Sequence, residues 1–257
     1  LPSFPPRIFS ALIDRARDLE PIRVAVAWPL SEVALRGACE AALGDLIIPV
    51  LVGPLDEITA LAAQLELDIS GYEQVEADSP KAAAAASVAL CRAGQADALM
   101  KGSLHTDDLL RAVLEAQSGL RTERRISHTF VLDVPAYARM LLVSDAAINI
   151  EPDLAGKLDI VQNAIDLARV LGVALPKAAI LSAVETVTPN MRSTIDAAAL
   201  CKMAERGQIT GGILDGPPAL DGASNPEAAR IKHLTSPVAG VADILIVPDL
   251  EVGNVLA

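Results

Sequence analysis

A short polar segment with one cation and one glycine, Met-Lys-Gly-Ser-Leu-His-Thr, occupies residues 100–106. Lys101 carries a compact positive charge, and Gly102 permits a ligand to approach the backbone closely. Thr106 precedes two aspartates, which suit the positive end of a helix dipole, and the free N–H groups of such a helix start bind anions. Because a single Lys-Gly pair is a weak signal and no P-loop spacing is present, the segment is either an anion-binding loop or an ordinary strand-to-helix turn.

A second polar segment, from Arg121 to His128, concentrates positive charge. It holds three arginines in a chain whose net charge is −12, so it forms a local basic patch that suits a multiply charged phosphate ligand. The alternative is a solvated loop, which is what a run of charges usually forms. Ser127 and His128 have the residue types of a nucleophile and its base, but adjacent residues rarely face each other in the required geometry.

Acidic residues follow four of the apolar segments that we expect to be strands. They are Asp145, Glu185, Asp215 and Asp249, and Asn149 lies four residues beyond the first. The carboxyl ends of parallel strands share one edge of a sheet, and ligands bind there. These acids could hold a divalent metal, but helix capping explains them as well. Since the three histidines and three cysteines form no ligand cluster, we expect no metal site.

Short apolar segments alternate with helical patterns along almost the whole chain. Continuously apolar strands are typical of sheets covered on both faces, so the pattern predicts an α/β fold with mainly parallel sheets. The clearest helix runs over about Pro152–Leu171, and Gly172 is placed to end it. The expected strands are Arg23–Ala27, Leu46–Val52, Asp97–Lys101, Thr129–Leu132, Met140–Val143, Ala178–Ala183, Gly211–Leu214 and Asp243–Val247.

Several helix starts are marked by capping residues. Ser79 and Asn225 each precede a proline, which combines a capping side chain with the residue favoured in the first helical position. Ser193 with Asp196 resembles a capping box. These signals place helices between the expected strands and support the alternating architecture.

Composition excludes several classes of protein. A net charge of −12 opposes nonspecific binding to nucleic acid or to anionic membranes, and 2% aromatic residues leave little for base stacking. No stretch of about 18 uninterrupted apolar residues is present, so no membrane-spanning helix is expected. The three cysteines are far apart and suit a reducing compartment. We therefore expect a cytoplasmic protein of one or two domains, given its 257 residues.

The polar segments also resemble, in order, those of one enzyme family. The matching stretches are MKGSLHT, RTERRISH, VSDAAINIEPDLAGK, PKAAILSAVE, LDGP, SPVAG and VPDLEVGN. Together they resemble the phosphate acetyltransferase/phosphate butyryltransferase family. They are nearest the acyltransferase half of bifunctional enoyl-CoA hydratase/phosphate acetyltransferase proteins.

The resemblance implies two α/β domains of the isocitrate/isopropylmalate dehydrogenase-like fold. The first would cover residues 1–122, with 252–257 and a further C-terminal segment completing it, and the second residues 123–251. The resemblance also implies a homodimer with a possible fused N-terminal enoyl-CoA hydratase domain. The implied reaction is reversible transfer of an acetyl or short acyl group between acyl phosphate and coenzyme A. Coenzyme A is a substrate in it, and no cofactor is expected.

The same resemblance implies where substrates bind. The phosphate-binding group would be Lys101, Gly102, Thr106, Ser127 and His128, in a cleft between the domains. Asp145, Asn149 and Asp215 would line the opposite wall, with Asn254 near the hinge. The family's catalytic Ser-Arg…Asp motif lies further towards the C-terminus than the match at Asn254, so no catalytic residue is assigned.

Two alternatives remain open. One is a non-catalytic domain that binds CoA or acyl phosphate, or acts as a scaffold, without the C-terminal catalytic motif. The other is a metal-dependent dehydrogenase of the same fold class, which the absence of a GxGxxG segment disfavours.

Overall fold

The computed structural model describes residues 7–257, and its backbone contacts divide them into two compact units. The first unit is Ala11–Glu123, and the second is Arg124–Ala257 together with the beginning of α1 (Arg7–Arg17). Residues 1–6 of the expected first domain lie outside the described residues. The break in the contacts falls one residue after the boundary expected from the sequence.

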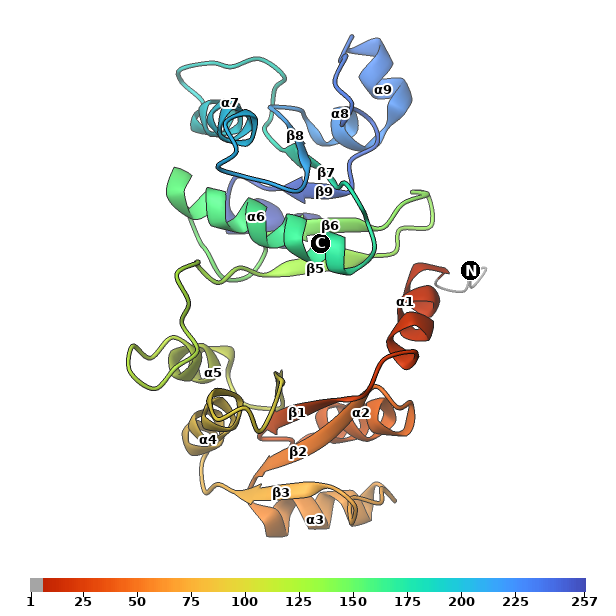
Figure 1. Ribbon diagram of the computed structural model, residues 1–257, viewed down its shortest axis with the longest axis vertical. Coiled ribbons are helices and arrows are strands. Elements are labelled where there is room, and N and C mark those ends of the chain that lie inside the picture. Colours follow the sequence, from red (N-terminus) through yellow and green to blue (C-terminus); the bar gives the residue numbers. More distant parts are fainter. Residues whose placement is uncertain (1–6) are drawn as a thin grey trace. The chain divides into compact units, whose positions relative to one another are not determined.

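The first unit contains a four-stranded parallel sheet in the order β3-β2-β1-β4 (Figure 1). The strands are β1 (Ile22–Ala27), β2 (Ile47–Gly53), β3 (Glu73–Glu76) and β4 (Ala98–Lys101). In the register of the sheet, Ala25 of β1 lies between Val50 and Leu99. β1 and β2 are buried along most of their length, as continuously apolar strands predict.

Helices supply apolar side chains to both faces of this sheet. α2 (Glu32–Leu43) and α3 (Leu55–Gln64) pack on one group of strand residues. α4 (Pro80–Arg92) and α5 (Thr106–Val113) contribute to the other apolar clusters. Most of the helix residues in these clusters are alanine, leucine or isoleucine, which matches the low aromatic content.

The second unit contains a five-stranded sheet in the order β5-β6-β9-β7-β8 (Figure 1). Its strands are β5 (Thr129–Leu132), β6 (Leu141–Ser144), β7 (Lys177–Ile180), β8 (Ile213–Asp215) and β9 (Ile244–Ile246). All neighbouring strands are parallel except β5, which pairs with β6 in the antiparallel sense. The polar ends of β6, β7, β8 and β9 therefore share one edge.

Helices also cover both faces of the second sheet. α6 (Leu154–Val170) and α7 (Arg192–Glu205) pack on one face, around the fully buried side chains of the larger core cluster. α8 (Leu220–Ser224) and α10 (Leu250–Leu256) contribute to the opposite cluster, and α9 (Pro226–Ile231) follows α8 directly. The α/β architecture predicted from the sequence is confirmed, and both sheets are mainly parallel.

The predicted helix ends are mostly confirmed. Ser79 and Asn225 accept hydrogen bonds from backbone N–H groups at the starts of α4 and α9. Gly172 follows α6 with φ +101°, a conformation that favours glycine. The predicted capping box at Ser193 is wrong, because α7 begins earlier and Asp196 is instead paired with a lysine of α6.

Residues 252–257 lie elsewhere than the sequence prediction places them. Residues 252–256 belong to α10 and Ala257 follows it, and this helix packs within the second unit rather than with the first. Gly253 makes this packing possible: a Cβ atom there would lie 2.7 Å from the carbonyl oxygen of Asp145 and 2.8 Å from Cα of Ala146. A side chain at this position would therefore push α10 away from the end of β6.

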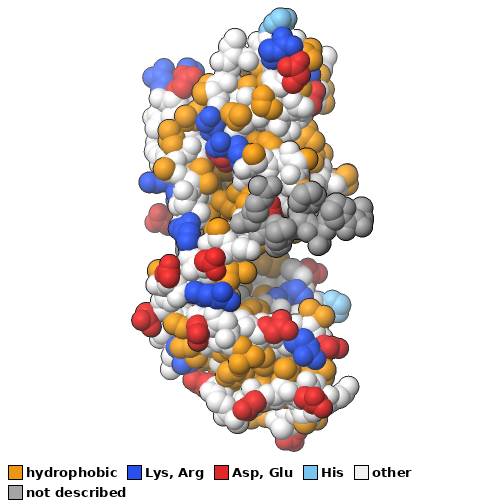
Figure 2. Space-filling model, turned by 90° about the vertical axis from the view of Figure 1, so that its right-hand side faces the viewer, with side chains coloured by type: hydrophobic (Ala, Val, Ile, Leu, Met, Phe, Trp, Pro, Cys, Tyr) orange, Lys and Arg blue, Asp and Glu red, His pale blue; other side chains and the backbone are white. Residues whose placement is uncertain are grey.

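The face shown in Figure 2 carries Lys and Arg side chains interspersed with Asp and Glu, and hydrophobic side chains lie between them. Among the residues that the structure describes, no helix has the length and apolar character needed to cross a membrane.

The three cysteines are free, and burial raises the pKa of each thiol. For Cys201, burial and then the nearby charges of Asp215 and Glu205 raise the pKa to about 12. With this pKa, only roughly one Cys201 thiol in ten thousand is ionised at pH 8, and the thiolate is the reactive form.

Because Cys201 is so little ionised, we expect iodoacetamide to leave it unmodified in the folded protein over a period that alkylates it fully in urea. Peptide mass spectrometry measures the alkylation of Cys201 in the folded and in the urea-treated protein. Fast alkylation of Cys201 in the folded protein would contradict its burial.

Candidate functional site

Lys101 and Gly102 lie at the carboxyl end of β4 in the first unit. Lys101 is exposed, and its ammonium donates to the carbonyl oxygens of Leu104 at 3.0 Å and Gly102 at 3.3 Å. The glycine is needed by the chain itself, because a Cβ there would lie 2.3 Å from the carbonyl oxygen of Trp28. Close approach of a ligand is therefore not required to explain Gly102.

Thr106 is the first residue of α5 and is exposed. The N-cap position belongs to His105, whose side chain makes no capping hydrogen bond. The start of α5 therefore lacks a side-chain cap, and its two following aspartates lie in the first turn, as predicted. Lys101, Gly102 and Thr106 occupy one continuous strand-to-helix connection.

In the second unit, the carboxylate of Asp145 organises the turn that follows β6. The residue is 3% exposed. One oxygen accepts from the backbone N–H groups of Ala147 and Ile148, both at 3.0 Å. The other accepts from the backbone N–H of Asn149 at 3.2 Å and from its side-chain amide at 2.5 Å. Four donors thus satisfy a buried carboxylate.

Asn149 connects this turn to the basic segment. Its amide nitrogen also donates to the carbonyl oxygen of Ile126 at 2.9 Å, and its amide oxygen accepts from the Arg125 guanidinium at 3.2 Å. From α6, the side-chain amide of Asn163 donates to Ser127 Oγ and to the carbonyl oxygen of Arg125, both at 2.9 Å. Two asparagines, one in the turn after β6 and one on α6, therefore position residues 125–127.

The basic segment is partly neutralised by α6. Arg124 pairs with Asp166 at 2.6 Å, and the backbone N–H of Arg125 donates to Asp159 at 3.0 Å. The acids of α6 thus compensate the local positive charge that the sequence shows, and they help to hold the segment in place.

Ser127 and His128 have separate partners. The hydroxyl of Ser127 accepts from Asn163, whereas the carbonyl oxygen of His128 accepts from Ser144 Oγ at 2.8 Å. The His128 ring packs edge-on against Phe130, with 4.4 Å between the ring centroids. Within residues 7–257, the buried Nδ1 atom of His128 has no hydrogen-bond partner. Such an atom can be satisfied by a water molecule or a ligand.

Asn254 lies at the same turn as Asp145, whereas Asp215 does not. The amide nitrogen of Asn254, on α10, donates to the carbonyl oxygen of Ala146 at 3.5 Å. Asp215 ends β8 and pairs with Ala179 of β7, so β9 and β7 separate its strand from β6. At about 4.8 Å per strand, this places β8 roughly 14 Å from β6.

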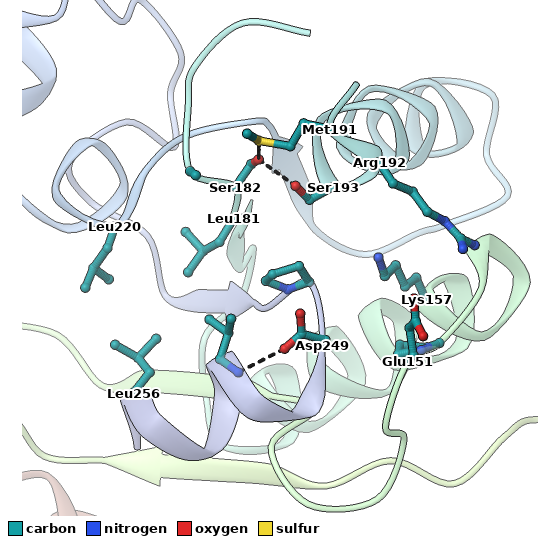
Figure 3. A pocket seen from close by; sticks show the side chains of 14 residues that line it. Glu151, Lys157, Leu181, Ser182, Met191, Arg192, Ser193, Leu220, Asp249 and Leu256 are labelled. Carbon is teal, nitrogen blue, oxygen red and sulfur yellow. Dashed lines mark hydrogen bonds between the residues drawn. The ribbon is translucent and has the colours of Figure 1, made fainter. Parts of the chain in front are cut away.

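A pocket of about 530 Å³ opens in the second unit at the carboxyl ends of β7 and β9 (Figure 3). The helices α6, α7, α8 and α10 complete its walls. The lining residues are Glu151, Pro152, Lys157, Leu181, Ser182, Ala183, Met191, Arg192, Ser193, Leu220, Pro248, Asp249, Val252 and Leu256.

A buried ion pair supports one wall of this pocket. The ammonium of Lys157 on α6 lies 2.7 Å from a carboxylate oxygen of Asp196 on α7, and both side chains are at least 92% buried. Arg192 approaches the same carboxylate at 3.6 Å. At the start of α7, the hydroxyl of Ser193 lies 2.7 Å from that of Ser182, which follows β7. A buried charge pair holds two helices in one arrangement, because separating the partners leaves an unpaired charge.

Sequence reasoning missed most of the pocket, since Asp249 was the one lining residue that it considered as a possible ligand-binding group. The position of Lys157 in the sequence could have indicated a buried site. It lies three residues before Ile160 and four before Val161, on the buried face of α6. A charged residue on a buried stripe predicts a buried partner. Asp249 was read as an acid at a strand end, and the structure shows that it caps α10 by accepting from Val252 N–H at 2.9 Å.

Lys232 joins two segments beside the pocket. Its ammonium lies 2.6 Å from Asp221 on α8 and 2.7 Å from Glu185 after β7. The hydrogen bonds from Lys232 lower the pKa of both carboxyls, and those two acceptors raise the pKa of Lys232. Within the described residues, no group of three His, Cys, Asp or Glu side chains is arranged to hold a metal ion.

Comparison with solved structures places the fold among phosphotransacylases. A branched-chain phosphotransacylase from Enterococcus faecalis V583 matches with a TM-score of 0.78 and 31% identity, over 91% of this chain and 82% of that one. The family model described as phosphate acetyl/butaryl transferase matches residues 79–257. The chain belongs to this family.

Named relatives support the assignment. A phosphate acetyltransferase of Rhizobium meliloti is 57% identical over 252 residues, which are 98% of this chain and 80% of that protein. A phosphate butyryltransferase of Clostridium acetobutylicum is 41% identical over 248 residues, covering 96% and 82% respectively. The family expected from the sequence is therefore confirmed.

The Asp145 turn yields a stability prediction. Replacing Asp145 by alanine leaves up to four donors without their acceptor, so we expect the free energy of unfolding to fall by roughly 3 kcal/mol or more. Asp153→Ala is the matched control, because Asp153 is exposed and accepts one hydrogen bond, from Gly156 N–H at the start of α6. This change should cost about 1 kcal/mol. Equal losses in urea titrations of the two variants would contradict the anchoring role of Asp145.

Proposed function

We propose that the protein is a phosphate acyltransferase that moves an acetyl or short acyl group reversibly between acyl phosphate and coenzyme A. Its membership of the phosphate acetyl/butaryl transferase family carries this proposal, supported by 57% identity to a phosphate acetyltransferase across almost the entire chain. In the reaction, the CoA sulfur forms a bond to the acyl carbon, and the bond between that carbon and the phosphate oxygen breaks. Phosphate leaves with the bonding electrons, and the thiol proton passes to a base.

The reaction sets two demands on the protein. A thiol with a pKa near 8.5 is mostly protonated at neutral pH, so a base is needed to form the nucleophile. The departing phosphate carries negative charge, which N–H groups and cations stabilise. No catalytic residue is assigned here, so the roles proposed below concern substrate binding by groups of residues.

Lys101, Gly102 and Thr106 are proposed to bind the phosphate of the acyl phosphate. The exposed ammonium of Lys101 and the start of α5, which lacks a side-chain cap, support this role. The carbonyl contacts of Lys101 hold its charge at the end of β4. A compact ammonium suits a phosphate oxygen.

Ser127, His128, Asp145, Asn149, Asp215 and Asn254 are proposed as further substrate-binding residues. Five of them lie around the turn after β6 or in the segment that it anchors. The buried, unpartnered Nδ1 of His128 supports contact with a ligand, and Asn149 acts by positioning the basic segment. Asp215 has the weakest support, because its strand lies apart from this group.

Several further features of the protein are proposed from its resemblance to the family. They are a two-domain fold of the isocitrate/isopropylmalate dehydrogenase-like type, a homodimer, a cytoplasmic location and a reaction that needs no cofactor besides its substrate coenzyme A. A fused N-terminal enoyl-CoA hydratase domain stays a prediction. A non-catalytic binding or scaffolding domain is not favoured, because the relatives are named as transferases along nearly the whole length of this chain.

The activity is tested by mixing the protein with acetyl or butyryl phosphate and CoA. We expect phosphate release and acyl-CoA formation in equal amounts, with neither formed in the absence of CoA. Chromatography of the CoA thioester and a colorimetric phosphate assay measure the two products. Phosphate release without acyl-CoA would indicate a hydrolase and would refute the proposal.

Lys101 yields a more specific prediction. Lys101→Ala should lower kcat/KM for acyl phosphate by roughly 10- to 150-fold, which corresponds to about 1.5–3 kcal/mol for a lost charge-assisted hydrogen bond. The melting temperature should change little, because the side chain is exposed. Lys81→Ala, at an exposed position of α4, is the charge-matched control and should leave kcat/KM unchanged. Identical kinetics of the two variants would assign Lys101 to the turn alone.

A further inference from the structure

Trp28 has an unusual backbone conformation for its residue type. It follows the last residue of β1, at the carboxyl edge of the sheet of the first unit, and its φ is +58°. Glycine enters this left-handed region readily, whereas a bulky side chain there is a genuine outlier. The residue also precedes Pro29, and a proline favours extended backbone in the residue before it. The folded protein therefore holds Trp28 in a conformation that its own chemistry disfavours.

The backbone of Trp28 binds the segment that follows β4. Its carbonyl oxygen accepts from the backbone N–H of Ser103 at 2.8 Å and from the Ser103 hydroxyl at 3.0 Å. The preceding carbonyl oxygen, of Ala27, accepts from the N–H of Gly102 at 2.8 Å. The N–H of Trp28 donates to the carbonyl oxygen of Val52 at 2.8 Å. The turn at Trp28 thus joins the end of β2 to the segment after β4.

The left-handed turn sets the direction of the Trp28 carbonyl. Because φ decides where the chain places the next peptide group, a negative φ would carry this carbonyl away from Ser103. Both hydrogen bonds from Ser103 would then be lost together. Gly102 fits against the same turn, since a Cβ there would lie 2.6 Å from the carbonyl carbon of Trp28. The two segments are therefore matched in shape as well as in hydrogen bonding.

The indole of Trp28 holds the turn in place. The side chain is partly buried and packs against two apolar clusters of the first unit. Burying so large a ring removes apolar surface from water, which offsets the unfavourable backbone conformation. Strained residues persist only where the surrounding structure holds them, and they concentrate at functional sites. The buried members of the two clusters are Val50, Val52, Ala77 and Ala83 in one and Ala27, Ala84 and Leu104 in the other.

Leu104 connects this packing to Lys101. The leucine is 3% exposed and belongs to one of the two clusters against which the indole packs. Its carbonyl oxygen accepts from the ammonium of Lys101 at 3.0 Å. The backbone of Trp28 thus holds residues 102 and 103, and the cluster beside its ring holds residue 104. The whole loop that orients the Lys101 ammonium depends on Trp28.

We propose that Trp28 is a positioning residue that holds the Lys101 ammonium in place to bind the phosphate of the acyl phosphate. The inference rests on the phosphate-binding role proposed for Lys101. Trp28 acts through Ser103 and Leu104 and does not itself contact the phosphate. A cation that is held in place before its ligand arrives binds more tightly, because less side-chain freedom is lost on binding.

The test separates the backbone of Trp28 from its packing. Trp28→Ala removes the ring and leaves a residue that disfavours a positive φ, whereas Trp28→Gly removes the ring but adopts this conformation freely. We expect KM for acyl phosphate to rise about tenfold in the alanine variant, equivalent to about 1.4 kcal/mol, and at most about threefold in the glycine variant. Trp28→Phe keeps an aromatic ring at this position, so its KM should stay within about twofold of the unchanged protein.

Asp45 provides a matched control. Its φ is also +58°, it is exposed, and it lies between α2 and β2, at the amino end of that strand. Asp45→Ala and Asp45→Gly therefore repeat the backbone comparison at the opposite edge of the sheet from Lys101. Neither should alter KM for acyl phosphate, although the alanine variant should melt at the lower temperature. KM for CoA should stay within about twofold in every variant.

Phosphate binding is measured separately from turnover. Isothermal titration calorimetry with inorganic phosphate gives a dissociation constant for each folded variant, without CoA or an acyl group. These constants should follow the same order, with the alanine variant weakest and the phenylalanine variant closest to the unchanged protein. Should Trp28→Ala fail to fold, as judged by circular dichroism, Trp28→Leu takes its place, because leucine keeps part of the apolar volume and suits a positive φ no better.

Phosphate binding that follows this order supports the role of Trp28 even if no acyl group is transferred, and in that case only the reaction is refuted. With turnover intact, a glycine variant as weak as the alanine variant would show that packing alone matters, and this result overturns the proposal. Altered melting temperatures with unchanged KM and unchanged phosphate binding overturn it as well, since Trp28 would then serve stability only. If the unchanged protein neither binds phosphate nor turns over acyl phosphate, the proposed role of Lys101 fails, and that of Trp28 fails with it.

Discussion

The buried carboxylate of Asp145 is the interaction on which the polar edge of the second unit depends. A carboxylate that is 3% exposed must find donors inside the protein, and three consecutive backbone N–H groups and one side-chain amide supply them. This requirement fixes the turn after β6 and the orientation of Asn149. Through Asn149 it also fixes Ile126 and Arg125, so the position of the basic segment follows from one satisfied charge.

α10 links that turn to the pocket. Gly253 and Asn254 lie against the backbone of Asp145 and Ala146, whereas Asp249, Val252 and Leu256 line the pocket. The backbone N–H of Leu250 also donates to the carbonyl oxygen of Ile150, 3.0 Å away. On the opposite wall, the Lys157–Asp196 pair joins α6 to α7. The turn and the pocket are therefore parts of one connected structure, in which a change at either end alters the setting of α10.

Sequence reasoning predicted the parts of this structure that depend on local pattern. Continuous apolar runs predicted eight of the nine strands found within residues 7–257, and the residue before a proline predicted two helix caps. β3 was missed because Glu-Gln-Val-Glu on the edge of a sheet has no apolar run. The antiparallel pairing of β5 was not predicted, since strand direction depends on the path of the connecting chain and not on the strand residues.

For the candidate site, too, the sequence predicted what depends on local pattern and missed what depends on distant contacts. Asp145, Asn149 and Asn254 were singled out from their motifs, and the structure brings them to one turn. The motifs could not show that the backbone of Trp28 leaves no room for a Cβ at Gly102. Nor could they show that Asp196 pairs with Lys157 and does not cap α7. Those facts depend on contacts between residues far apart in the sequence. The pocket was invisible for the same reason, because five separate segments of the chain build its walls.

Isotope exchange tests the central claim, that acyl phosphate and CoA react directly on this protein. Labelled inorganic phosphate is mixed with acetyl phosphate and the protein, and label in acetyl phosphate is measured with and without CoA. Direct transfer predicts label in acetyl phosphate only when CoA is present, because phosphate re-enters through acetyl-CoA. Exchange without CoA would show a covalent acyl-protein intermediate, and no exchange under either condition would show that the protein does not catalyse the reaction.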